Sequence, residues 1–150
     1  MLGLTKKQFL KKSASCLDEA GNHALLIREL IDHETDGAIH NREEYNQIKR
    51  IIEGIESSFF RYEKLNPPSQ CVSLQLKILN CLIILQEATS SNYDFITASI
   101  EGGDGSDKEK LNESKILLEK FRKAFRPLTK EVDSYFKPYK KSKSKRNLKQ

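Results

Sequence analysis

The sequence predicts an all-α protein: an antiparallel up-down-up-down bundle of four helices, followed by a disordered basic C-terminal tail. Three observations lead to this prediction. Apolar residues recur at steps of three and four along separate segments, one central stretch is apolar on every side, and turn-forming sequences divide the segments. A chain of 150 residues is long enough for one domain. We therefore assign residues 1–136 to the bundle and residues 137–150 to the tail.

The first helix should begin at Thr5. Thr5 and Gln8 have the spacing of a capping box, in which each side chain accepts a hydrogen bond from the other residue's backbone N–H. An apolar stripe follows at heptad spacing, and Gly37 should end the segment after a polar stretch. The stripe consists of Leu10, Leu17, Ala20, Ala24, Ile27 and Ile31.

The second helix should begin near Asn41, a plausible N-cap, and end before the Pro67-Pro68 pair. Proline disfavours the helical conformation in the residue before it and suits the first turn of a new helix. The same pair should therefore open the third helix. The stripe of the second helix is Tyr45, Ile48, Ile52, Ile55, Phe59 and Tyr62.

The third helix, from Cys71 to Ile100, should be the centre of the bundle. Seven of the eight residues from Ile78 to Leu85 are apolar, which leaves no face for water, and a helix that is apolar all round is a buried one. Three other helices of the chain would cover it. The alternative is a three-helix assembly completed by a dimer partner. Polar residues interrupt the apolar run, so we do not expect a transmembrane segment: Lys77, Asn80, Gln86 and Glu87.

A glycine-rich turn, residues 101–105, precedes the fourth helix, which should begin at a second capping box, Ser106 to Glu109. Pro127 should kink this helix without ending it, because the apolar heptads continue past it. Heptads on the second and fourth helices predict coiled-coil packing at about +20°. The fourth stripe is Leu111, Ser114, Leu118, Phe121, Phe125, Leu128, Val132 and Tyr135.

The net charge of +5 is concentrated in the tail. Residues 137–150 include seven basic and no acidic residues, which leaves 19 basic and 21 acidic residues in the body. The tail could bind nucleic acid weakly and without sequence preference, or simply keep the protein soluble. The candidate contact residues are Lys140, Lys141, Lys143, Lys145 and Arg146.

The three cysteines suggest a reducing compartment. In one helix, Cys71 and Cys81 would be about 15 Å apart, too far for a disulfide. Ser13 to Cys16 imitates a lipoprotein cleavage box, but Lys11 and Lys12 stand where a leader would be apolar. We therefore expect a cytoplasmic protein with free thiols, and export only if a leader is missing from this sequence.

Arg28 and His33 fit the Arg-x4-His pattern of HEPN-type helical ribonucleases. That resemblance would make both residues catalytic: His33 would move a proton at the ribose hydroxyl, and Arg28 would hold the phosphate. Positions five apart on a regular helix point about 140° apart. They could therefore meet in a cleft only if the helix is distorted or a second subunit completes the site.

Metal ligation receives less support from the sequence. Di-iron bundles use Glu-x-x-His motifs, and this chain has none. Residues 102–107 match one calcium-binding Gly-Gly-x-Gly-x-Asp repeat, but such repeats act only when stacked, so we interpret this one as a loop. We predict no metal and no cofactor. The ligands that could be considered are His23, His33, His40, Glu19, Glu29 and Glu34.

Residues 10–136 resemble a class of bacterial helical-bundle proteins of uncharacterised function. The shared features are two polar heptad-patterned helices, a Leu-x-Pro-Pro reversal (Leu65 to Pro68), a more apolar third helix and an acidic glycine-rich turn. Many members of that class are exported. The resemblance implies the bundle fold and assigns no catalytic residue.

No stretch has a strong catalytic, metal or nucleotide signature, so the sequence favours a protein that is not an enzyme. The leading hypothesis is a helical bundle that acts by presenting a face to an unknown protein partner or to a second copy of itself. The alternatives are a HEPN-like ribonuclease using Arg28 and His33, and an accessory nucleic-acid binder acting through the tail.

Overall fold

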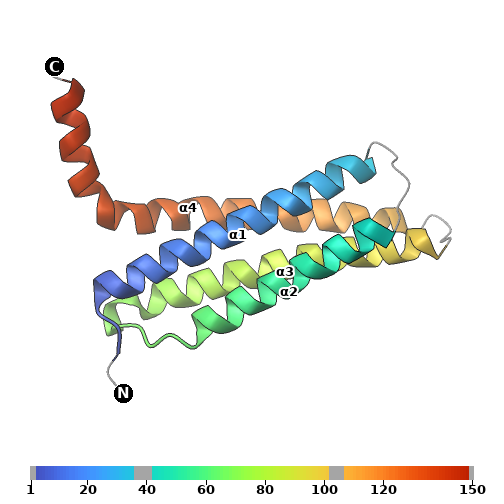
Figure 1. Cartoon of the computed structure of the whole chain (residues 1–150), viewed down its shortest axis with the longest axis horizontal. Coiled ribbons are helices and arrows are strands. Elements are labelled where there is room, and N and C mark those ends of the chain that lie inside the picture. Colours follow the sequence, from blue (N-terminus) through green and yellow to red (C-terminus); the bar gives the residue numbers. More distant parts are fainter. Residues whose placement is uncertain (1–2, 36–41, 102–106, 149–150) are drawn as a thin grey trace.

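The computed structural model describes residues 3–35, 42–101 and 107–148, and within these ranges it consists of helices and their connections. The elements are α1 (Lys6–Thr35), α2 (Arg42–Glu63), the 3-10 turn η1 (Ser69–Cys71), α3 (Val72–Ile100) and α4 (Asp107–Leu148). Successive helices run in opposite directions along one long axis (Figure 1). The predicted up-down-up-down bundle is confirmed.

The capping box at the start of α1 is also confirmed. The Thr5 backbone N–H donates to Gln8 Oε1 at 2.9 Å, and the Gln8 N–H donates to Thr5 Oγ1 at 3.1 Å. These bonds pair two backbone donors that the first turn of the helix leaves open. The caps expected at Asn41 and Ser106 lie outside the described residues.

The reversal between α2 and α3 has its own polar contacts. Gln75 Nε2, on α3, donates to the backbone carbonyl oxygens of Tyr62 at 3.4 Å and Leu65 at 3.0 Å. The backbone N–H of Leu4 donates to Asn66 O at 3.2 Å. These bonds fasten the segment before α1 and the start of α3 to the residues preceding the proline pair, so the expected tight reversal is present.

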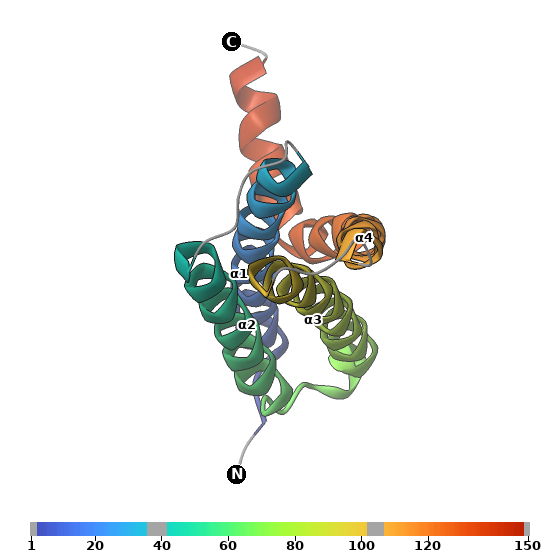
Figure 2. The ribbon, with the colours of Figure 1, turned by 90° about the vertical axis from the view of Figure 1, so that its right-hand side faces the viewer.

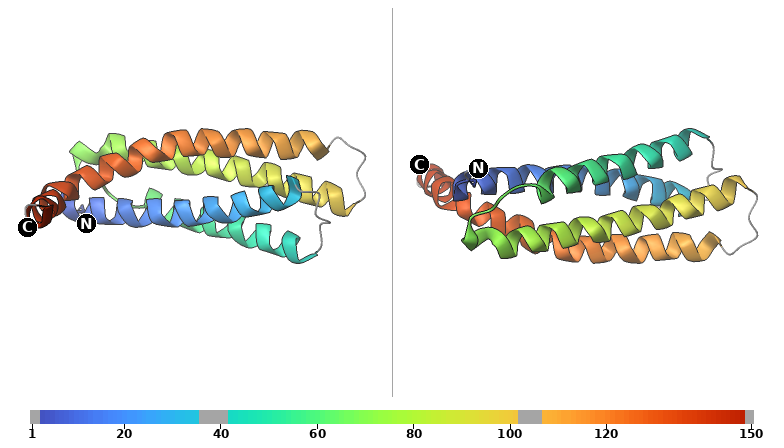
Figure 3. Two further views of the ribbon diagram at one scale, coloured as in Figure 1. Left: turned by 90° about the horizontal axis from the view of Figure 1, so that it is seen from above. Right: turned by 90° about the horizontal axis from the view of Figure 1, so that it is seen from below.

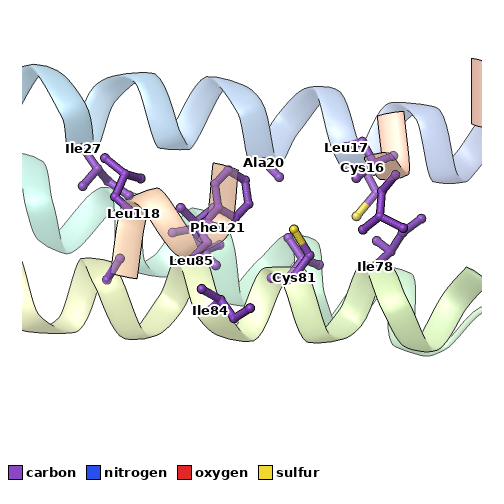
Figure 4. Close-up of a cluster of buried hydrophobic side chains, with 14 of the residues drawn as sticks. Cys16, Leu17, Ala20, Ile27, Ile78, Cys81, Ile84, Leu85, Leu118 and Phe121 are labelled. Carbon is purple, nitrogen blue, oxygen red and sulfur yellow. The ribbon is translucent and has the colours of Figure 1, made fainter. Parts of the chain in front are cut away.

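Helix α3 contacts each of the other three helices, as expected for the central element. The end-on view places α2 and α4 on different sides of α3 (Figure 2). By length and composition alone, Ser69–Ile100 could cross a membrane, but half of its most apolar window is buried against the neighbouring helices. In the close-up, Ile78, Cys81 and Leu85 of α3 lie among residues of α1 and α4 (Figure 4).

The prediction that α3 has no exposed face between Ile78 and Leu85 is wrong, because Asn80 and Ile83 are both exposed. The Ile83 side chain is 40% exposed, and Leu79 is only partly buried. Three helices cover three sides of α3, and the fourth side faces outward through Leu76, Asn80 and Ile83. Helical periodicity was obscured here by apolar residues on the outer face.

The apolar stripes of the other helices face the core as predicted, with small departures. In α1 the stripe is buried except at Ala24, which is intermediate. In α2, Ile51 is buried beside the stripe, whereas Ile52 is intermediate. In α4, Tyr135 is 44% exposed near the end of the stripe.

Helix α4 is the longest element, and it remains helical through Pro127 and as far as Leu148. The sequence predicted a disordered tail from residue 137, whereas the structure extends the helix there. Lysine and serine can form a regular helix without packing against a core, although they gain little from it. This last part turns away from the other three helices (Figure 1).

Candidate functional site

A groove runs along the surface between α1 and α4, with a volume of about 450 Å³. Its floor is apolar and includes the buried residues Leu17, Leu118 and Phe121, together with half-buried Phe125. The rings of Phe121 and Phe125 stack with their centroids 5.0 Å apart. These residues come from the apolar stripes of both helices. Leu17, Leu118 and Phe121 are almost fully buried, so the apolar surface exposed at the groove comes from residues such as half-buried Phe125 and exposed Leu25.

Gly21 sets how closely the two helices approach each other at the groove. A Cβ atom at this position would lie 3.2 Å from Phe125 Cζ. The missing side chain lets the Phe125 ring rest against the backbone of α1. The groove is therefore lined on one side by helix backbone and on the other by an aromatic ring.

Three arginines line the same groove: Arg28 from α1, and Arg122 and Arg126 from α4. Arg122 Nη1 donates to Glu119 Oε2 at 3.3 Å, an exposed contact within α4. Arg28 and Arg126 are exposed, and neither has an acidic partner in the described part of the chain. Asp18 is the acidic residue among the lining side chains. An apolar floor with a mostly cationic rim suits an anionic amphipathic partner.

The sequence had singled out Arg28 for a different reason, and it missed Arg122 and Arg126. The spacing of the latter two, four residues apart next to two phenylalanines, was the available signal. This spacing indicates a shared site only when the structure places α4 beside Arg28 of α1.

The structure does not bring Arg28 and His33 together within one chain. Arg28 lines the groove toward α4, whereas His33 Nε2 lies 3.6 Å from Glu44 Oε1 on α2. The His33 side chain is 62% exposed. A ribonuclease site using both residues would thus need a second subunit, and it stays a prediction that the nuclease activity of a His33→Ala variant would test.

A second hollow, of about 310 Å³, lies between α1 and α2. Two of its three charged residues, Glu19 and Arg61, pair with each other, whereas Lys12 has no ion pair with a described residue. Arg61 Nη2 lies 3.0 Å from Glu19 Oε1, and Ser58 Oγ donates to Glu19 Oε2 at 3.0 Å. Nearby, Ser13 and Tyr62 share a hydrogen bond of 2.7 Å between their hydroxyl groups. These side chains of Arg61, Glu19, Ser58, Ser13 and Tyr62 therefore have partners within the chain.

His23 packs directly on the backbone of α2 at Gly54. A Cβ atom on Gly54 would lie 2.6 Å from His23 Cε1, too close for any side chain without a shift. Burial lowers the pKa of His23, with nearby Glu19 acting in the opposite direction, and His23 Nδ1 is buried without a hydrogen-bond partner. His23 therefore acts as a packing residue in this seam.

A buried polar pair lies toward the C-terminal end of α1. Asn92 Nδ2 donates to Glu34 Oε2 at 2.8 Å, and the two residues are 0% and 5% exposed. Burial raises the pKa of Glu34 to about 8, while the hydrogen bond from Asn92 acts in the opposite direction. Glu34 Oε1 and Asn92 Oδ1 are buried and have no hydrogen-bond partner among the described residues. Both atoms are acceptors when Glu34 is charged, so a proton on the carboxyl group supplies the donor that the pair lacks.

Among the described residues, no three His, Cys, Asp or Glu side chains form a group able to hold a metal ion. His40 lies outside them. The three cysteines are free and buried, and burial raises the pKa values of Cys16 and Cys81 to about 12. Both thiols are therefore protonated at neutral pH and are poor nucleophiles.

The basic residues from Lys140 to Arg146 lie on the part of α4 that turns away from the bundle (Figure 1).

Comparison with protein-family models, curated proteins and solved structures found no match to this chain. Its function is therefore inferred from its own residues.

Proposed function

We propose that this protein is a non-enzymatic helical bundle that acts by binding another protein or a second copy of itself. The observation that carries the proposal is the groove between α1 and α4. Its floor is apolar, and two of its rim arginines have no acidic partner in the described chain. A partner that covers Phe125 and Leu25 and pairs with the arginines would gain both hydrophobic and electrostatic free energy.

Exposed apolar side chains support the same proposal. Leu25, at the groove, is 58% exposed, and Leu76 and Ile83 on the outer face of α3 are 61% and 40% exposed. Single exposed apolar residues are common, but a residue beside an apolar groove enlarges the surface that a partner can bury. The proposal also includes a reducing cytoplasmic compartment, which the three free cysteines support.

Sedimentation velocity combined with site-specific photo-crosslinking tests the proposal. A photoreactive residue would replace Leu25 in one variant, Ile83 in a second, and the exposed Glu53 of α2 in a control. We expect either a dimer in sedimentation, or a reproducible adduct of defined mass at Leu25 or Ile83 and not at Glu53. A monomer at all concentrations with no adduct at either position would overturn the proposal.

Nucleic-acid binding through the tail is a second candidate, favoured by the position of the tail. The helical segment that carries Lys140 and its basic neighbours projects away from the bundle (Figure 1), where a polyanion could approach it without meeting another helix. Binding to a mixed-sequence DNA duplex should then fall steeply with salt. Unchanged affinity after removal of residues 138–150 would exclude this candidate.

A further inference from the structure

The three arginines of the groove between α1 and α4 form a ladder along it. Arg122 and Arg126 are four residues apart on α4, about 6 Å along the helix axis. The contact between Gly21 and Phe125 gives the register of the two antiparallel helices. Measured from Gly21 toward the C-terminal end of α1, Arg28 lies about 10 Å along the axis. Arg122, three residues before Phe125 on the antiparallel α4, lies about 4 to 5 Å along in the same direction, so Arg28 is about 6 Å past Arg122. The order along the groove is therefore Arg126, Arg122 and Arg28, with neighbouring arginines about one helical turn apart and about 12 Å from first to last.

This spacing matches the carboxylates on one side of an α-helix. Glutamates at positions i, i+4 and i+8 are also about 6 Å apart along the axis. An arginine guanidinium binds a carboxylate through two parallel hydrogen bonds, so each step of the ladder can form a strong contact. A ligand with a single anionic head group would engage only part of the ladder.

The floor of the groove supplies the apolar half of the recognition. Leu118 and Phe121 lie at its base, with the Phe125 ring beside them and exposed Leu25 at its edge. Helices that bind in grooves do so through apolar anchors one turn apart, and charged residues beside the anchors set the orientation. A volume of about 450 Å³ accommodates a few such anchor side chains and not a whole helix, which would lie along the opening.

We infer that the groove binds an amphipathic helix of a partner protein, with carboxylates one turn apart facing Arg28, Arg122 and Arg126, and apolar anchors against Phe125 and Leu25. This inference rests on the proposed function and names the chemistry of the partner. Asp18, which lines the same groove, opposes a continuous polyanion such as a nucleic-acid backbone and fits a partner with a few placed charges.

A synthetic peptide tests the inference with the full-length protein. The probe is a fluorescent 16-residue helical peptide with three glutamates four residues apart and leucines along the adjacent face. We expect it to bind with an affinity that falls with salt, because the rim of the groove is exposed. A peptide of the same composition with the order scrambled, and one with lysine in place of glutamate, should bind at least about tenfold more weakly, a difference of about 1.4 kcal/mol.

Charge reversal locates the binding site. Arg28→Glu and Arg126→Glu should each weaken the binding of the acidic peptide about tenfold, and the double variant should weaken it further. Both residues are exposed and have no described partner, so the fold should be retained, as circular dichroism would verify. The matched control is Lys120→Glu, an exposed cation of α4 that does not line the groove, and it should change the affinity less than twofold.

Three outcomes would overturn the inference. The scrambled peptide could bind as tightly as the striped one, or Lys120→Glu could weaken binding as much as Arg126→Glu, which would indicate general charge attraction. Vesicles of anionic phospholipid could displace the peptide completely, which would indicate a lipid surface as the occupant. A crosslinked partner at Ile83 with none at Leu25 would retain the proposed function and refute the groove as its site.

Discussion

Helix α1 borders two hollows, and they differ in where their charged groups find partners. In the hollow toward α2, Glu19 accepts from both Arg61 and Ser58, so the cation is neutralised within the chain. In the groove toward α4, Arg28 and Arg126 have no acidic partner among the described residues. In the first hollow, Glu19 and Arg61 satisfy each other, and Lys12 is the one lining charge without an ion pair to a described residue. The second has charges and apolar surface available for another molecule, which is why we place the proposed function there.

The end of α1 shows why the unpaired arginines must lie at the surface. Glu34 also lacks a cationic partner at hydrogen-bonding distance in the described part of the chain, but it is buried, and burial favours its neutral form. Water can solvate Arg28 in the open groove, whereas it cannot reach Glu34. An unpaired charge is thus tolerated in the groove and suppressed in the core.

The largest expected effect is the gain in stability of Glu34→Gln at high pH. The folded protein keeps the Glu34 proton up to about pH 8, whereas the unfolded chain releases it near pH 4.5. The stability from this proton is complete below pH 4.5, declines as the pH rises and is gone above about pH 8. A neutral glutamine can both donate to Asn92 Oδ1 and accept from its amide. We expect a gain of up to about 5 kcal/mol at pH 9 and little change at pH 4, by chemical denaturation, because each pKa unit corresponds to about 1.4 kcal/mol.

If Glu34→Gln changed the free energy of unfolding by the same amount at every pH, the raised pKa of Glu34 would be contradicted. The control is Glu29→Gln, an exposed glutamate one to two turns earlier on α1. It should leave the pH dependence of unfolding unchanged.

The next effect concerns the contact between α1 and α2 at which His23 packs against Gly54. Alanine is a better helix former than glycine by about 1 kcal/mol, so Gly54→Ala should stabilise α2 if only propensity counted. The new Cβ would instead lie 2.6 Å from His23 Cε1. We expect a net loss of about 2 kcal/mol in thermal or urea unfolding, because the ring must move in a packed seam. Combining the variant with His23→Ala should remove most of the penalty, which a double-mutant cycle would measure.

The corresponding substitution at the groove between α1 and α4 should behave differently. At Gly21→Ala the new Cβ would lie 3.2 Å from Phe125 Cζ, a contact that a shift of a few tenths of an ångström relieves. Phe125 borders the groove and has room to move, so the gain in helix propensity should prevail. We expect stabilisation of up to about 1 kcal/mol. A loss as large as that of Gly54→Ala would show that the two seams are equally tight.

The smallest effect compares two arginines by truncation. Arg61→Ala removes the ion pair with Glu19 and should cost about 0.5 kcal/mol, the usual size for an exposed pair. Arg126→Ala removes no described partner and should change the free energy of unfolding by less than that. Equal losses in urea denaturation would indicate that Arg126 contributes to the fold, and would weaken the comparison between the two hollows.

The sequence predicted the parts of this molecule that depend on local spacing. The Thr5–Gln8 box and the apolar stripes specify where helices begin and which side they bury, and the proline pair specifies a reversal. Ile83 was misjudged because an apolar residue on the outer face is indistinguishable, by type alone, from one in the core.

The groove could not be predicted in the same way. Arg28 and Arg126 are distant in the sequence, and they line one groove only because α1 and α4 pack with Phe125 against Gly21. The Glu34–Asn92 pair is similar, since neither residue shows by itself that the other is buried beside it. Sites formed between helices require the tertiary arrangement.

An even number of antiparallel helices returns the chain to the end from which it started, and α1 begins at the same end at which α4 leaves the bundle (Figure 3). Attachment of the protein to a surface or to a fused domain through either terminus would hold the rod by that one end. The opposite end, where α1 and α3 end and α2 and α4 begin, would then point outward, and the long sides would remain free.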